Sequence, residues 1–592
     1  MNFKPIVALW LTGCMVASVT LASDPVAPVI TNINGSGLTR NLRFPLYPAA
    51  EAYIILGGTN LAQPLVANTN FTRSPYIISA ATNGTNYGYE WRITNAVAPA
   101  GFYRVAVTPM SSNALLTANS LNRLAYGPTP DELERVTAIG AQAFIDEQLA
   151  PWNLIEDVAV THTNLAFIGS KFCPATNFVT ATNANLADLR AWHILRAIGA
   201  RRQLLEILLQ FFENHFVTQY TKSENYVGGF YPDSTVSTPV AVQFEFLEND
   251  RWRNALLNPA CTFYDLLKIS AESPAMIIYL DTVTSRGDSA RVANENYARE
   301  LLELFTFGVD NGYDQSDITT MSRAWTGWTT KFVDLTNAYN PFATQTTTII
   351  PGSTNSSTAI SNLLGAWAFN YDSTHHNSSN KIVFPGKIVP ARFGSPWAGA
   401  NYQLTLTNGS GTNSIQDGYQ VLAHVANQPF TEEYICIKLC RLLVHDDFPN
   451  PSNDTNNPAF AFYNYAAGNL SPEAQLVHDC MLTWENSLPK GQLWKVLKTI
   501  TDSDLFRSHG GSGQKIKTPL EFSVSTIRAL RSGSNGTYTA SSDGYSIGGL
   551  TASSISILSR AGNMLLFDRD APDGYAESAA AWISAGTLAE RV

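Results

Sequence analysis

The chain has 592 residues, of which 45% are hydrophobic, 11% aromatic and only 15% charged. That length predicts roughly two to four domains, because one domain usually holds about 100–200 residues. A formal net charge of -10 argues against non-specific nucleic-acid binding, which needs a basic surface. The low charged share, balanced by Asn, Thr, Ser and Gly, suits an exported protein with long polar loops.

Residues 1–22 have the pattern of a secretory signal peptide. Lys4 is the positive n-region, residues 6–17 form an apolar segment too short to cross a bilayer, and residues 20–22 resemble a cleavage site. We therefore expect a secreted or periplasmic protein. The alternative is lipoprotein anchoring through Cys14, because the four residues ending there resemble a lipobox. No later segment predicts a transmembrane helix.

The cysteines do not define a disulfide framework. Removing the signal peptide leaves five of the six, so they cannot all pair within one chain. Cys436 and Cys440 lie four residues apart on a predicted helix, where backbone geometry opposes a bridge between them. Because no cysteine or histidine spacing matches a zinc site, we expect small buried side chains.

Residues 28–108 have the pattern of a small all-β sandwich. The segments 89–94 (YEWRIT) and 102–107 (FYRVAV) each place alternate apolar side chains, Ile93 and Val105 among them, on one face. Gly, Asn and Pro lie between the short predicted strands, where turns are expected. The pattern resembles fibronectin type III or immunoglobulin-like modules, which usually space or bind and rarely catalyse.

Residues 113–592 predict a large, mainly α-helical domain with long polar loops. One helix start is well marked, because Thr129 suits the N-cap, Pro130 the first helical position and Glu132 a capping box. Further helices are expected over 185–219 (one long or two consecutive), 273–280, 430–444 and 487–506. Polar loops are expected at about 333–362, 395–416, 449–459 and 531–554. The predicted fold class is multidomain, with a small all-β sandwich followed by this helical domain.

The segment 293–328 concentrates charge in a chain that has little of it. On a helical wheel Glu295, Arg299 and Glu303 form an i, i+4 ladder on the polar arc, whereas Phe305 lies within the apolar arc. The pattern alone predicts a solvated ladder, whose links are worth about 0.2–0.5 kcal/mol each. Phe305 is expected to be a core residue.

At this segment the sequence resembles the bacterial proteins grouped as domain of unknown function 1800. Residues 294–328 are similar to the central signature of that family, and 121–151 to its opening motif. Other similar segments follow in order at 211–216, 273–281, 369–381, 515–530 and 571–584. The resemblance covers residues 113–592.

The resemblance implies a mostly helical, exported protein from a family without established activity. The family is often encoded beside a second uncharacterised family with a sulfatase-like look, which implies a partner protein of that kind. This chain departs from the pattern at Phe305, where relatives usually have His, and at Asn377, where they usually have Asp. Relatives often continue a little further, which leaves a truncated C-terminus open.

The resemblance also changes the expectation for Arg299. Because the whole charged arc belongs to the family signature, we expect Arg299 to be buried against carboxylates. Loss of a buried Arg299 would cost about 3–5 kcal/mol, whereas loss of a solvated one would cost less than ~1 kcal/mol.

One interpretation of function is an extracellular or periplasmic hydrolase that acts on a polymer, with metal assistance as an option. Polar residues within the motifs are of the kinds that build an acid–base or metal-assisted site. The candidates are His215, Asp281, Glu295, Arg299, Glu303, His376, Lys381, Lys517 and Glu521. No Ser-His-Asp elbow, HExxH motif, P-loop or dinucleotide fingerprint supports this interpretation.

The other interpretation, which we favour, is a non-catalytic binding or scaffold protein of the cell surface or periplasm. The β module would act as a spacer, and the expected ligand is a polysaccharide or another cell-envelope component. We predict no cofactor and no stoichiometric transition metal. The weak metal-ligand candidates are His215, Glu303 and His376, and the histidine usual at 305 is Phe here. Whether the protein is an enzyme stays open.

Overall fold

A computed structural model describes most of the chain between residues 29 and 582. The described ranges are 29–35, 39–45, 50–60, 62–68, 71–81, 84–93, 101–109, 112–156, 168–169, 171–172, 184–287, 292–334, 365–407, 409–446, 448, 463–468, 470–507, 515–530, 564, 566–578 and 581–582. The predicted signal peptide, Cys14, Cys173 and the polar stretches 449–459 and 531–554 lie outside them. The chain divides into two compact units, Met1–Pro109 with Ser508–Gly510, and Met110–Arg507 with Gly511–Val592.

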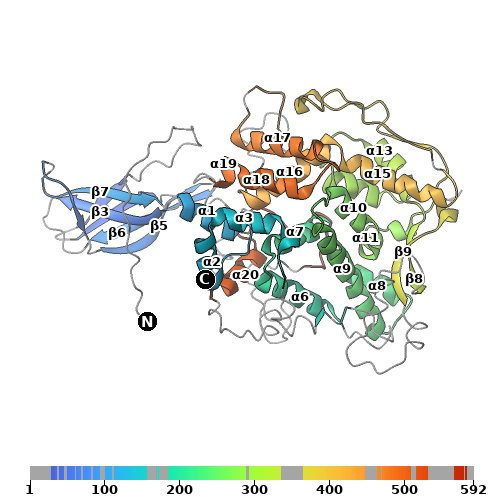
Figure 1. Cartoon of the computed structure of the whole chain (residues 1–592), viewed down its shortest axis with the longest axis horizontal. Helices are drawn as coiled ribbons and strands as arrows, with labels where there is room; N and C mark the ends of the chain where they lie inside the picture. The colour runs from blue at the N-terminus through green and yellow to red at the C-terminus, as the bar shows by residue number, and fades with distance from the viewer. Residues whose placement is uncertain are drawn as a thin grey trace. The chain divides into compact units, whose positions relative to one another are not determined.

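The first unit contains two small antiparallel sheets. Figure 1 draws the strands of this unit in blue. One sheet has the strand order β1-β2-β6-β5 and the other β4-β3-β7. The strands are β1 (Asn32–Asn34), β2 (Arg40–Pro45), β3 (Ala50–Gly58), β4 (Val66–Asn68), β5 (Phe71–Ala81), β6 (Gly84–Ile93) and β7 (Phe102–Pro109).

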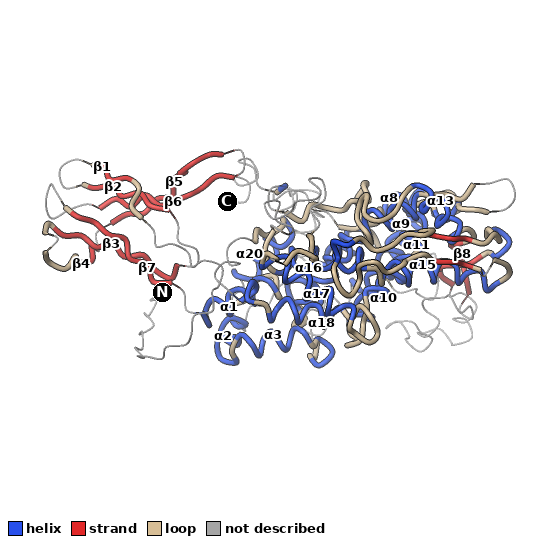
Figure 2. The backbone as a smooth tube through the Cα atoms, turned by 90° about the horizontal axis from the view of Figure 1, so that it is seen from above, coloured by secondary structure: helices blue, strands red, loops and turns tan. Residues whose placement is uncertain are grey.

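The two sheets of this unit share one apolar core. Figure 2 shows them as two separate layers. Leu42, Phe44 and Ile93 contribute from the four-stranded sheet, and Ile55 and Val105 from the three-stranded sheet. The alternation read from the sequence is therefore correct for Ile93 and Val105, because inward-facing side chains recur at every second residue of a strand.

The second unit is mainly helical, so the predicted fold class is confirmed. Its helices begin with α1 (Ser112–Arg123), α2 (Pro130–Ile139), α3 (Ala141–Leu149), α6 (Leu186–Gly199), α7 (Gln203–His215), α8 (Tyr220–Gly228) and α9 (Ser234–Leu256). They continue with α10 (Phe263–Ala271), α11 (Pro274–Tyr279), α12 (Asn296–Glu300), α13 (Gln315–Ser322), α15 (Gln416–Ala426), α16 (Pro429–Leu443), α17 (Pro472–Glu485), α18 (Leu493–Asp502), α19 (Asp504–Arg507) and α20 (Pro519–Leu530). The long helical pattern at 185–219 is two consecutive helices, α6 and α7.

Four short strands lie within the helical unit. β8 (Trp328–Asp334) pairs with β9 (Gly365–Tyr371), and β10 (Lys381–Val383) pairs with β11 (Leu404–Leu406), both antiparallel. The polar stretch 395–416, expected to be a loop, therefore contains the β11 strand. Cys261, Cys436, Cys440 and Cys480 are all buried and free, as expected of small core side chains.

The start of α2 is partly as predicted. The Thr129 hydroxyl accepts a hydrogen bond from the Glu132 backbone N–H at 3.2 Å, and Pro130 is the first helical residue. The Glu132 carboxylate, however, forms an ion pair with Arg528 of α20. A charged partner from a distant segment thus replaces the expected half of the capping box.

The signature helix ends in a π-helical turn. α12 runs into a turn of this type at Leu301–Phe305, and the Thr306 hydroxyl donates to the Leu301 carbonyl at 2.6 Å. Phe305 is buried, as predicted. The expectation that Arg299 is buried is wrong, because its side chain is 36% exposed and its two carboxylate partners are similarly solvated.

Candidate functional site

The nine candidate residues do not converge on one site. Glu295, Arg299 and Glu303 form a half-exposed ladder on α12, with Arg299 3.4 Å from Glu295 and 3.5 Å from Glu303. Asp281 lies after α11 and forms an exposed ion pair of 2.9 Å with Lys222. These four residues occupy solvated positions, where charge pairs contribute little to stability.

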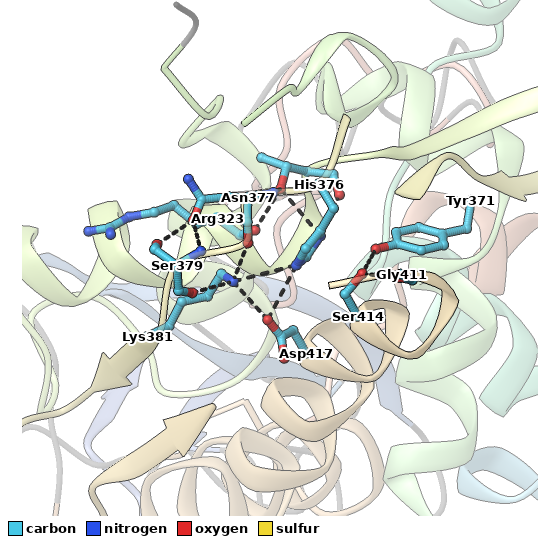
Figure 3. A network of polar contacts seen from close by, with 10 residues as sticks. Arg323, Tyr371, His376, Asn377, Ser379, Lys381, Gly411, Ser414 and Asp417 are labelled. Atoms are coloured by element: carbon cyan, nitrogen blue, oxygen red, sulfur yellow. Dashed lines mark hydrogen bonds and ion pairs between the residues drawn. The ribbon is translucent and has the colours of Figure 1, made fainter. Parts of the chain in front are cut away.

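A second group is a fully buried polar network around Lys381, at the start of β10 (Figure 3). Lys381 Nζ lies 2.7 Å from Asp417 Oδ2, and both side chains are at most 1% exposed. His376 Nε2 lies 3.3 Å from the same oxygen, while its Nδ1 lies 2.9 Å from the Thr326 carbonyl. Burial opposes ionisation of Asp417, but hydrogen bonds from His376 and Lys381 hold its pKa below the usual value.

The ammonium group of Lys381 is saturated within this network. Besides Asp417, its Nζ donates to the carbonyl oxygens of Asn377 at 2.7 Å and Ser379 at 3.1 Å. An ammonium group has three N–H donors, and three oxygens accept them here. Asn377 stands where relatives usually have Asp, and its side-chain oxygen accepts a hydrogen bond from the Ser379 N–H as a carboxylate oxygen would. The network holds β10, α15 and the 373–379 segment together, which is a structural role.

A third group surrounds two adjoining hollows in the helical unit. The larger has a volume of about 40 Å³ and the smaller about 10 Å³, so together they hold only a few water-sized groups. Both are lined by Ile207, Leu442, Lys515 and Glu521. The smaller is also lined by Asn122, Arg123, Ala125, Tyr126 and Lys517. The opening and closing motifs, almost 400 residues apart, therefore meet here.

Lys517 lines the smaller hollow. Its Nζ donates to Ser525 Oγ at 2.7 Å and to Asn122 Oδ1 at 3.0 Å. Burial, together with nearby Arg528 and Arg123, lowers the Lys517 pKa to about 8 although Glu521 opposes the shift. A lysine with this pKa exists partly as the neutral amine near neutral pH, and a neutral amine accepts protons.

Glu521 has a capping function at the start of α20. Its carboxylate accepts a hydrogen bond from the Thr518 backbone N–H at 2.8 Å, and the Thr518 hydroxyl accepts from the Glu521 N–H at 3.3 Å.

In the larger hollow the Glu577 carboxylate pairs with Lys438 and Arg441. Burial opposes ionisation of Glu577, but these two cations hold its pKa at about 2.

His215 belongs to the aromatic core beside the larger hollow. It ends α7, and its Nε2 lies 3.0 Å from the Phe305 carbonyl, so Nε2 carries the proton. The ring stacks on Phe211, which lines the hollow, and contacts Phe305 edge-on. Burial lowers the His215 pKa well below its usual value, so the imidazole is neutral.

The three weak metal-ligand candidates lie in different surroundings. His215 contacts the Phe305 carbonyl, His376 contacts Asp417, and Glu303 contacts Arg299. Across the described ranges, no three His, Cys, Asp or Glu side chains gather in a way that would hold a metal ion. In the same ranges no helix has the length and apolar character that crossing a bilayer requires.

Sequence reasoning missed Asp417, Ser525 and Asn122. Ser525 lies one helical turn after Glu521, so the i, i+4 spacing on α20 was the available signal for placing it near the hollow. Asp417 had no such signal, because it reaches Lys381 from 36 residues away.

The family model that matches this chain is described as protein of unknown function (DUF1800), and it covers residues 119–592. No curated protein and no solved structure matches the chain. Because the match spans most of the chain and includes every motif described above, the protein belongs to the DUF1800 family.

Proposed function

We propose that this is a secreted or periplasmic, non-catalytic protein that binds or scaffolds a component of the cell envelope. The observation that carries the proposal is the saturation of Lys381. The buried Lys381 uses its donors on Asp417, Asn377 and Ser379. The ladder around Arg299 is half-exposed, so neither motif presents a preorganised reactive group to a substrate.

The first unit supports the role of a spacer or binding module. Its sheets contain four strands in the order β1-β2-β6-β5 and three in the order β4-β3-β7. An immunoglobulin constant-type module likewise packs a four-stranded ABED sheet on a three-stranded one. We therefore propose an immunoglobulin-like or fibronectin type III-like module here. Modules of these types serve mainly for spacing and recognition.

The proposed ligand is a cell-envelope polysaccharide, and a sulfatase-like protein is the proposed partner. Co-sedimentation of the purified chain with insoluble envelope polysaccharide tests the binding function. We expect the chain to enter the pellet while the polymer keeps its length distribution. A shortened polymer, or new reducing ends or free acyl groups in the supernatant, would refute the non-catalytic function.

Export is tested separately, by N-terminal sequencing of the protein from its native host. A mature chain that begins near Ser23 supports cleavage of residues 1–22. A lipid on Cys14 would replace this by lipoprotein anchoring. An uncleaved chain in the cytoplasm would contradict export.

A second candidate function, a hydrolase that acts on a polymer, is favoured by one observation. Lys517 lines a hollow, and burial lowers its pKa to about 8, which suits a general base near neutral pH. The polymer assay above separates the two candidates, because only a hydrolase changes the polymer.

A further inference from the structure

We propose that Ser525 and Lys517 form a nucleophile–base pair that removes small acyl groups, such as O-acetyl esters, from a polysaccharide. The inference rests on the second candidate function, the hydrolase, and assigns its reacting atoms and its substrate class. Neither a metal nor a cofactor takes part in it.

The first support is the geometry of the pair. Lys517 Nζ lies 2.7 Å from Ser525 Oγ, which is within the reach required of a base that activates a hydroxyl nucleophile. Ser525 lies on α20 and is half-buried, and Lys517 precedes the helix. Asn122 Oδ1, 3.0 Å from the same Nζ, fixes the direction of the amine. Serine–lysine pairs of this type replace Ser-His-Asp triads on several unrelated folds.

The second support is the protonation state of the base. The hollow is lined by Arg123 and Lys515 in addition to Lys517, and burial lowers the Lys517 pKa to about 8. Roughly a tenth of the Lys517 side chains are then neutral at pH 7. The neutral amine accepts the hydroxyl proton, whereas an ordinary surface lysine would be charged.

The third support is the close approach of a backbone segment to both reacting atoms. Gly127 of the opening motif has a φ of +102°, a conformation that favours glycine. A Cβ added there would lie 3.1 Å from Ser525 Oγ and 3.2 Å from Lys517 Nζ. Both distances are shorter than ordinary van der Waals contact, so the absence of a side chain is what lets this backbone pack beside the pair. Lys517 lines the adjoining hollow of about 10 Å³, which holds about one water-sized group and leaves no room for a large acyl chain.

The reaction balances without a further reactant except water. Ser525 Oγ attacks the ester carbonyl carbon while its proton passes to the neutral Nζ of Lys517. The bond from the carbonyl carbon to the polymer oxygen breaks, and Nζ returns the proton to that oxygen as the alcohol leaves. Water then attacks the acyl-serine and gives a proton to Nζ. The acyl–Oγ bond breaks, Oγ regains the proton, and a carboxylic acid is released.

Fluorophosphonate labelling and hydrolysis of 4-nitrophenyl acetate, both on the full-length chain, test the proposal. We expect the label on Ser525, as mapped by peptide mass spectrometry. Ser525→Ala and Lys517→Met should each reduce kcat/KM by about 10³-fold or more. The wild-type kcat/KM should rise with pH to a plateau with an apparent pKa near 8. Thr526→Ala is the matched control, because its exposed hydroxyl donates only to the Phe522 carbonyl one turn earlier.

Melting curves of each variant establish that it is folded. Should Lys517→Met be unfolded, the Ser525→Ala variant and the labelling map still decide the result. Hydrolysis that survives Ser525→Ala, or a label on another serine, overturns the Ser525–Lys517 pair but leaves the hydrolase function standing. A folded wild-type chain with neither label nor hydrolysis of the ester or the acetylated polysaccharide overturns both.

Discussion

Lys381 and Asp417 form an ion pair that is sealed from solvent, with Nζ 2.7 Å from Oδ2 and both side chains at most 1% exposed. Removing one partner leaves the other charge buried without compensation, which typically costs about 3–5 kcal/mol. We therefore expect Lys381→Ala and Asp417→Ala each to lower the free energy of unfolding by about that amount, as measured by chemical denaturation.

The double variant Lys381→Met with Asp417→Leu separates the cost of an unpaired charge from the worth of the pair. Because two apolar residues leave no buried charge, we expect a smaller loss than from either single alanine variant. A double variant that is less stable than both single variants would show that the ion pair itself stabilises the fold by more than an unpaired buried charge destabilises it.

Arg299→Ala should lower the free energy of unfolding by less than ~1 kcal/mol, because its links to Glu295 and Glu303 are half-exposed. Arg253→Ala is the matched contrast. Arg253 is buried and contacts both carboxylate oxygens of the buried Glu206, at 2.8 and 3.0 Å. Its loss should cost about 3–5 kcal/mol. Equal losses in urea melts would show that exposure does not decide the difference.

Phe305→Ala should cost about 3–5 kcal/mol, because it leaves a cavity between His215 and Phe216. Phe332→Ala on β8 is the control, since that ring is 41% exposed and its loss should cost less than ~1 kcal/mol. Thermal or denaturant melts compare the two. A near-wild-type melt of Phe305→Ala would contradict its placement in the core.

The buried Glu248 on α9 should make the protein less stable as the pH rises from 6.5 to 8. Burial raises its pKa from 4.5 to about 8, so the folded state holds a proton that the unfolded state has released. Its stabilising effect is complete below pH 4.5 and is lost as the pH rises through 8. Two of the buried histidines, His193 and His215, have lowered pKa values and act in the opposite direction only below about pH 6.5.

Glu248→Gln tests this dependence, because the amide does not titrate. Each titrating carboxyl contributes a slope of about 1.4 kcal/mol per pH unit. Denaturant melts between pH 6.5 and 8 should show a flatter decline for the variant than for the wild type. Parallel curves would exclude Glu248 as a source of the slope. Glu213 and Glu245 are also buried with raised pKa values, and they contribute equally to the pH dependence of stability in the variant and the wild type.

The sequence predicted those parts of the fold that depend on local pattern. The Thr129 cap, the burial of Phe305 and the change from strands to helices follow from spacing within one turn or one strand. The π-helical turn at Leu301–Phe305 was missed, because the helical wheel assumes 3.6 residues per turn throughout.

Pairings between distant segments could not be read from one sequence. Glu132 has the spacing of a capping box, yet its carboxylate forms an ion pair with Arg528. The helical wheel predicted a solvated ladder around Arg299, as the structure has it, whereas the burial expected from the family resemblance is wrong. Lys517 was a candidate from its motif, but its contact with Ser525 depended on the path of the chain into α20.

The contacts of Arg528 also determine when the chain is able to finish folding. Its guanidinium donates to the carbonyl oxygens of Gly127 and Ile198, which were synthesised 401 and 330 residues earlier. At about 5–20 residues per second, the 127 segment waits roughly 20–80 s for this partner. Until then the chain near α2 and α6 lacks the hydrogen bonds that Arg528 of α20 donates to it. The packing around Gly127 and Ile198 is therefore completed only after most of the chain has been synthesised.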